Sequence, residues 1–177
     1  MKTKLLLTAI VIASIGSCAI KKEPKMELTN MKEFKVIGIS IRTTNENGKA
    51  ARDIPQLWNK FMTENIMEKI PNKVNGNIYS IYTEYEGDYM KPYTTILACE
   101  VSSFDEVPEG MVAKTIKGGN FKQYVAKGNL DEGIIYNTWL KIWEDKIDRA
   151  YTADFEVFSS KAQNRENAEI DIFVGVK

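Results

Sequence analysis

The two halves of the chain repeat one order of sequence patterns, and this repeat constrains the fold more than any other feature. The segment "IPQLWNKFM" aligns with "IYNTWLKIW", so that Trp58 matches Trp139. Further along each half, "YSIY" aligns with "FEVF" and "ILACEV" aligns with "DIFVGV". Each half therefore reads as strand, helix, strand, strand. Because one such unit leaves an apolar sheet face uncovered, two units are expected to pair about a pseudo-two-fold axis. We predict an α+β domain with an antiparallel sheet and two main helices.

The helices and turns of this fold have recognisable boundaries. Apolar residues recur at helical spacing from Asp53, which suits a helix start, to Pro71, which must end the helix. A second helix is predicted to follow the capping residue Asp131. Between the halves, "MVAKTIKGGNFKQYVAKG" is typical of a β-hairpin that turns at Gly118 and Gly119.

The first residues have the pattern of a targeting segment rather than of a folded domain. Two lysines precede a short apolar run, which is followed by "IGSC". These four residues resemble a bacterial lipobox, which implies cleavage before Cys18 and lipid attachment to it. We predict a lipoprotein signal peptide at 1–17, a lipidated tether at 18–30 and a folded domain at 31–177, in a protein that is lipid-anchored to a bacterial membrane at the cell envelope. An ordinary secretory signal and an uncleaved anchor are the alternatives.

Composition excludes several classes of function. Lysine plus arginine and aspartate plus glutamate both number 24, so no basic excess indicates nucleic-acid binding. The chain contains no histidine, which removes Ser-His-Asp and Cys-His catalysis and histidine-ligated zinc or haem. Its two cysteines are too few for a thiolate cluster within one chain. We therefore expect no metal site, no cofactor and no nucleic-acid partner.

Two acids interrupt the apolar strands of the second half. Alternation along a strand places Glu156 on one face with Phe158, and Asp171 on one face with Phe173. If the two strands form a hairpin, both acids can lie on the same face beside these aromatic rings. The matching positions of the first half are uncharged, so the repeat does not need acids in order to fold. The face is either exposed to water or lines a pocket where a carboxylate attracts a cation or transfers a proton.

The aromatic residues have two interpretations as well. Trp139 and Trp143 lie on the predicted second helix, near the acid-bearing strands, and Tyr82 lies in a tyrosine-rich stretch. At helical spacing, tryptophans are more often core residues than ligand contacts. The match between Trp58 and Trp139 favours packing for that pair, whereas Trp143 matches a methionine.

These segments together resemble the GyrI-like (AraC effector-binding) domain family. The resemblance rests on "IPQLW..F", "GGNFKQYVAKG", the "W...W" helix, "FEVF" and the closing "IDIFVGV", and it covers about residues 26–177. It implies a duplicated strand-helix-strand-strand fold with a central pocket between the halves, which accepts hydrophobic, often cationic, small molecules. Many members are fused to a helix-turn-helix, for which we find no room here, and a few hydrolyse small molecules.

The resemblance also implies site residues. It places the central pocket acid on Glu156, the acid and the aromatic residue of the last strand on Asp171 and Phe173, and the helix tryptophan on Trp139 or Trp143. Two phenylalanines stand where tyrosines are common in the family. Fewer hydroxyl groups weaken an enzymatic interpretation more than a binding one.

These observations leave three possible functions for the protein. The first is a non-enzymatic lipoprotein, held at the membrane by the lipid on Cys18, that binds a hydrophobic, cationic small molecule. The second is a hydrolase with Glu156 as general acid/base, and the third is a protein-interaction module with a vestigial pocket. Sequence reasoning favours binding over catalysis. The candidate ligand-binding residues are Glu156, Asp171, Trp139, Trp143, Phe173, Phe158 and Tyr82.

Overall fold

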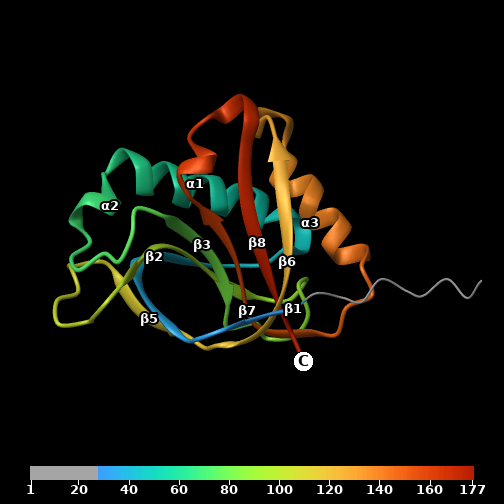
Figure 1. Ribbon diagram of the computed structural model, residues 1–177, viewed down its shortest axis with the longest axis horizontal. Coiled ribbons are helices and arrows are strands. Elements are labelled where there is room, and N and C mark those ends of the chain that lie inside the picture. Colours follow the sequence, from blue (N-terminus) through green and yellow to red (C-terminus); the bar gives the residue numbers. More distant parts are fainter. Residues whose placement is uncertain (1–27) are drawn as a thin grey trace, which may run out of the picture.

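A computed structural model describes residues 28–177, in which eight strands form one antiparallel sheet and the two long helices lie against one of its faces (Figure 1). The predicted α+β fold is confirmed. The predicted signal peptide and Cys18 lie outside the described residues. Residues 28–30, which we expected to belong to the tether, form a strand instead.

Within the described range, the element boundaries are as follows. The strands are β1 (Leu28–Met31), β2 (Phe34–Thr43), β3 (Ile78–Thr83), β4 (Tyr93–Val101), β5 (Val112–Ile116), β6 (Gly119–Gly128), β7 (Arg149–Phe158) and β8 (Ala168–Val176). The helices are α1 (Ala50–Thr63), the single turn α2 (Ile66–Lys69) and α3 (Ile134–Glu144).

The duplication predicted from the sequence is visible in the order of the sheet. The strands lie side by side as β1-β6-β8-β7-β3-β4-β2-β5. The first unit, β2-α1-β3-β4, and the second unit, β6-α3-β7-β8, therefore meet where β3 pairs with β7, and the order is symmetric about this pair. The two central strands place Ser80 directly opposite Glu156. The centre of the molecule is thus built from the matched strands of the two halves.

The first helix differs from its predicted boundaries. It begins three residues before Asp53, whose carboxylate accepts a hydrogen bond from Thr43 Oγ1 at 2.7 Å and pairs with Lys49 at 3.1 Å. Asn65 then adopts a left-handed conformation, which separates α1 from the single turn α2. The left-handed region is accessible to asparagine at little energetic cost, so this residue ends the long helix before Pro71 does.

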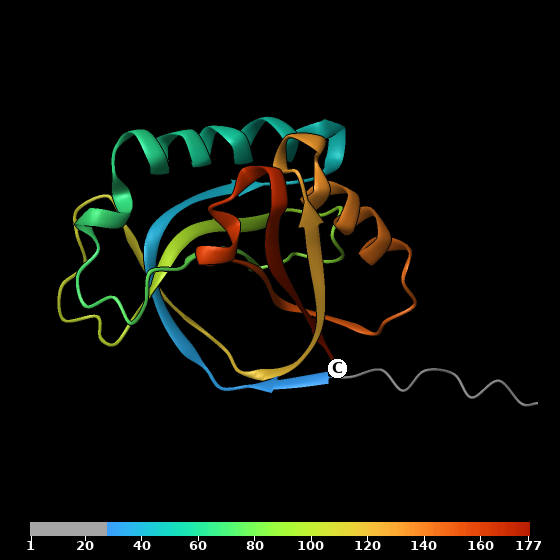
Figure 2. The same cartoon turned by 45° about the horizontal axis from the view of Figure 1, so that its top comes forward.

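The predicted hairpin at Gly118 and Gly119 is wrong. Strand β5 pairs with β2, whereas β6 pairs with β1 and β8, so that the two strands that flank these glycines join opposite ends of the sheet. At the crossing, a Cβ atom on Gly118 would lie 2.5 Å from the carbonyl oxygen of Met31. Gly118 allows two backbones to pass at close range, between strands at opposite ends of a sheet that is curled (Figure 2).

The curled sheet buries apolar side chains on both faces. On the helix side, Leu57 and Phe61 of α1 pack against β2 and β4, and Ile142 of α3 packs against β8. On the other side, the curl encloses a second cluster centred on Phe155 and Phe121. Because both faces are covered, most residues of β3 and β4 are buried, and neither strand alternates between buried and exposed positions.

Gly38 lies at a point where the sheet leaves no room for a side chain. A Cβ atom there would lie 2.0 Å from the carbonyl oxygen of Leu97, because β2 is held between β4 and β5 at this point. We expect Gly38→Ala to lower the free energy of unfolding by about 3 kcal/mol, as measured by urea denaturation. Gly76→Ala is the matched control, since nothing lies within 4 Å of its new methyl group. Equal stabilities of the two variants would contradict this account.

Candidate functional site

A cavity of about 640 Å³ lies between α1, α3 and the central strands β3 and β7. Its walls come from both halves of the duplicated fold and are dominated by aromatic side chains. Among its lining residues, two carry charge, Glu156 and Arg149. The residues around it include Trp58, Tyr82, Tyr85, Tyr89, Tyr93, Ile54, Ile135, Tyr136, Trp139, Trp143 and Phe158.

Glu156 forms the floor of this cavity. Only 2% of its surface is exposed, and its Oε1 atom accepts hydrogen bonds from Trp139 Nε1 at 2.7 Å and from Tyr82 OH at 2.8 Å. The Tyr82 hydroxyl in turn accepts from Ser80 Oγ at 3.1 Å. Both hydrogen bonds, from Trp139 and from Tyr82, reach Oε1. Burial raises the pKa of this carboxyl group, and hydrogen bonds from Trp139, Tyr82 and Ser80 oppose that rise.

A second buried acid, Asp154, lies two residues earlier on the same face of β7. It is fully buried, and its oxygens are saturated with partners. Gly175 N donates to Oδ1 at 2.9 Å, Tyr85 OH donates to Oδ2 at 2.7 Å, and the Arg149 guanidinium forms an ion pair with Oδ2. Asp154 is therefore neutralised, whereas no described cation lies within ion-pair distance of Glu156.

Aromatic contacts build the walls around this floor. Trp139 and Tyr82 meet edge to face, with ring centroids 5.4 Å apart, so both groups that bind Glu156 also pack on each other. Trp143 stacks on Tyr89 at 4.9 Å with an angle of 10° between the rings, which joins α3 to the loop between β3 and β4. On the other side, the first half of the repeat contributes Trp58, whose ring meets Phe158 at 4.8 Å.

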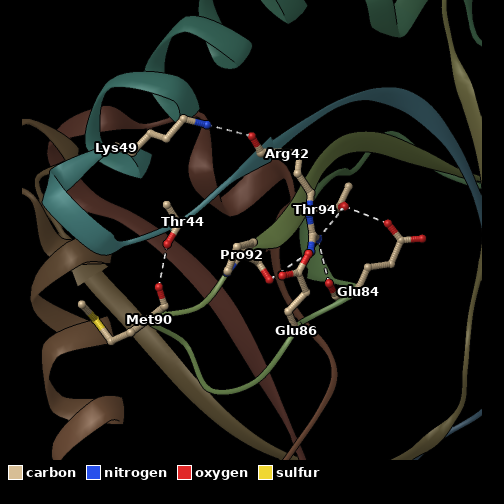
Figure 3. A network of polar contacts seen from close by, with 8 residues as sticks. All are labelled: Arg42, Thr44, Lys49, Glu84, Glu86, Met90, Pro92 and Thr94. Atoms are coloured by element: carbon tan, nitrogen blue, oxygen red, sulfur yellow. Dashed lines mark hydrogen bonds and ion pairs between the residues drawn. The ribbon is translucent and has the colours of Figure 1, made fainter.

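The loop 84–92 is fixed by a polar network (Figure 3). Arg42 donates to the carbonyl oxygens of Glu84 and Pro92 and pairs with Glu86 at 2.6 Å, while Thr44 Oγ1 donates to the carbonyl oxygen of Met90. These contacts attach the loop to β2 and to Thr44, the residue that follows it. The loop therefore presents its tyrosine side chains to the cavity from a fixed backbone.

Five of the seven predicted ligand-binding residues lie around the cavity, and two do not. Our prediction that Asp171 shares a face with Glu156 is wrong, because Glu156 lies opposite Ile172 and Asp171 lies opposite Val157 in the pairing of β7 with β8. A difference of one residue in register moves a whole strand pattern to the other face. The residues that line the cavity as predicted are Glu156, Trp139, Trp143, Phe158 and Tyr82.

The two displaced residues have other environments. Asp171 accepts a hydrogen bond from Gln123 Nε2 at 2.8 Å, on the far face of the sheet. Phe173 stacks on Phe155 at 5.1 Å and belongs to the apolar cluster inside the curl. Neither residue lines the cavity.

Sequence reasoning missed several cavity residues. The equivalence of Trp58 with Trp139 was available as a signal, because both repeats direct this tryptophan to the same cavity. Asp154, which does not line the cavity but pairs with Arg149 of its wall, was available too, since it shares a strand face with Glu156. No local signal identifies Arg149. Its ion pair with Asp154 spans an irregular stretch of β7 between the two residues.

Fold and cavity together define a small-molecule-binding domain, in which two duplicated units enclose an aromatic pocket over a buried carboxylate. The sequence model of the Cass2 family, the integron-associated effector binding proteins, matches residues 27–176, and the chain belongs to this family. The assignment agrees broadly with the GyrI-like resemblance seen in the sequence.

The chain is also similar to three proteins. The Vibrio cholerae integron cassette protein VCH_CASS2 superposes with a TM-score of 0.68 at 27% identity, over 85% of this chain and 95% of that one. The structure of SAV2435 bound to tetraphenylphosphonium has a TM-score of 0.70 at 13% identity, over 85% and 93% of the chains, and shows the shared fold. The "Putative transcriptional regulator protein YobU" of Bacillus subtilis (strain 168) is 23% identical over 85% of this chain and 96% of its own.

Residues 28–177 lack two further features. No group of three or more acidic, cysteine or histidine side chains there is arranged to hold a metal ion. Nor does any helix in that range have the length and apolar character needed to span a bilayer.

The raised pKa of Glu156 predicts a pH-dependent stability. The folded state holds the proton to higher pH than the unfolded state, where the ordinary value of 4.5 applies. The stability that protonation contributes is therefore complete below 4.5 and is lost as pH rises through the raised pKa. We expect the free energy of unfolding of the unliganded protein, relative to Glu156→Gln, to fall over this window in urea titrations. A difference that stays constant with pH would contradict the burial effect.

Proposed function

We propose that this protein is a non-enzymatic binding module for a hydrophobic, cationic small molecule, and that a lipid on Cys18 holds it at the cell envelope. The observation that carries the ligand class is the buried carboxyl group of Glu156, which lines a cavity with aromatic walls and forms no ion pair with any described residue. A cation in this position gains an ion pair in a poorly solvated site, and it also gains contacts with the faces of aromatic rings.

The size of the cavity supports a ligand of moderate bulk. Its volume of about 640 Å³ lies within the range of sites for drug-sized molecules. Tetraphenylphosphonium, the ligand of the similarly folded SAV2435, is itself a hydrophobic cation. An open cavity of this size gives no support to a protein-interaction module whose pocket is vestigial.

A hydrolase is the second candidate, and one contact favours it. Tyr82 donates a hydrogen bond to Glu156, whose raised pKa suits a general acid/base. Phe158 stands where GyrI-like domains commonly have a tyrosine, so the cavity lacks the hydroxyl group of that position. We therefore place binding ahead of turnover.

The binding proposal predicts a charge-selective effect of one substitution. Glu156→Gln should weaken the binding of tetraphenylphosphonium at least about tenfold, since the cation then loses its ion pair, while the neutral triphenylphosphine oxide binds as before. Quenching of tryptophan fluorescence measures both affinities, because Trp139 and Trp143 line the cavity. Asp171→Asn is the matched control, as it removes a carboxylate on the far face of the sheet and should leave both affinities unchanged.

Other outcomes of this titration separate the candidates. Equal loss of both ligands in Glu156→Gln would remove the charge-recognition role of this carboxylate. Hydrolysis of ester analogues by the wild type, abolished in Glu156→Gln, would favour the enzyme instead.

Membrane attachment has its own test. When the full chain is expressed in a bacterium, the wild type should partition into the detergent phase of a Triton X-114 extract and incorporate labelled palmitate, because a diacyl anchor is strongly apolar. Cys18→Ser should appear in the aqueous phase without label. Ser17→Ala serves as the control for a change beside the cleavage site. A wild type found wholly in the aqueous phase would overturn the lipoprotein proposal.

A further inference from the structure

The geometry points to a pocket that accepts one positive charge and excludes a second, with Arg149 as the residue that sets this limit. This inference rests on the proposed binding of a hydrophobic cation and names its charge. We infer that the ligand is a monocation whose remaining surface is neutral.

The first observation is the position of the guanidinium group. Arg149 lines the cavity although its side chain is only 6% exposed. Its Cζ atom lies 5.9 Å from the ring centroid of Trp139, and the same indole donates its N–H to Glu156. The two charged side chains of the cavity therefore contact one tryptophan, the carboxylate at its edge and the guanidinium over its face.

The second observation is the place of the neutralising acid. Asp154 pairs with Arg149 and is completely buried, but it is not among the residues that line the cavity. The cationic partner of this ion pair thus contributes to the cavity wall, and the anionic partner lies behind it. A second positive centre on a ligand would meet Arg149 without reaching Asp154.

The third observation concerns the balance of charge. Asp154 and Glu156 point to the same side of β7, and Arg149 cancels one of them. One negative charge remains to be neutralised at the floor of the cavity. Nε and Nη1 of Arg149 are buried and have no hydrogen-bond partner among the described residues, so Asp154 engages only one of the three guanidinium nitrogens. A monocation completes the neutrality of this site, whereas a dication leaves it with an excess positive charge.

Two cations of the same shape test this inference. Methyl viologen carries two positive charges, and N-methyl-(p-tolyl)pyridinium replaces one of its charged nitrogens by carbon. Isothermal titration calorimetry on the wild-type protein should give at least about tenfold tighter binding of the monocation. In Arg149→Gln, methyl viologen should gain at least about tenfold relative to the monocation, because Asp154 and Glu156 are then both without a cation.

A double variant protects the test against loss of folding. Arg149→Gln with Asp154→Asn replaces the buried ion pair by two neutral groups. This double variant should also raise the affinity for methyl viologen relative to the monocation, but by less than the single variant does. Circular dichroism and the unfolding midpoint identify which variants are folded. If Arg149→Gln does not fold, the ratio of the two affinities in the double variant tests the inference instead.

The results that would overturn the inference are distinct from a failure of the proposed function. Equal affinities of the wild type for the two cations would overturn it, as would an unchanged ratio in every folded variant. If neither cation binds to the wild type at all, the proposed function fails, and the inference fails with it.

Discussion

The rest of the site depends on the buried carboxylate of Glu156 and the two groups that hold it. One oxygen accepts from Tyr82 on β3 and from Trp139 on α3, so a single atom joins a strand of the first half to a helix of the second. An unpaired buried charge is costly, and these two hydrogen bonds offset part of that cost. They also hold the carboxyl group in place at the floor of the cavity. The interaction that stabilises the charge in the unliganded protein is therefore the one that orients it for a ligand.

The duplicated fold explains why the cavity is symmetric in shape but not in charge. Equivalent tryptophans, Trp58 and Trp139, supply walls from the two halves. At the centre of the sheet, however, Ser80 lies opposite Glu156, and the charged side chains that face the cavity both belong to β7. The two repeats form the walls of the cavity, and residues that differ between the repeats carry its charge.

Much of the fold could be predicted from the sequence, and the site could be predicted in part. The order of elements and the pairing of the two halves follow from the repeat. The apolar stripe from Leu57 to Phe61 identifies α1, and the central acid was found at Glu156. The hairpin at Gly118 was wrong, because paired glycines suit a turn and a close crossing equally well. Nothing local distinguishes a glycine that reverses the chain from one that lets another strand approach.

The sequence by itself determined which residues share a face within one strand, since side chains alternate along any extended chain. That sufficed to place Glu156 with Phe158. Only the tertiary structure decided which faces of neighbouring strands coincide, because register depends on the loop 159–167 and on the irregular start of β7. For this reason Asp171 lies on the far face. The ion pair between Arg149 and Asp154 likewise exists only once β7 is bent, since it joins residues that an extended strand would hold apart.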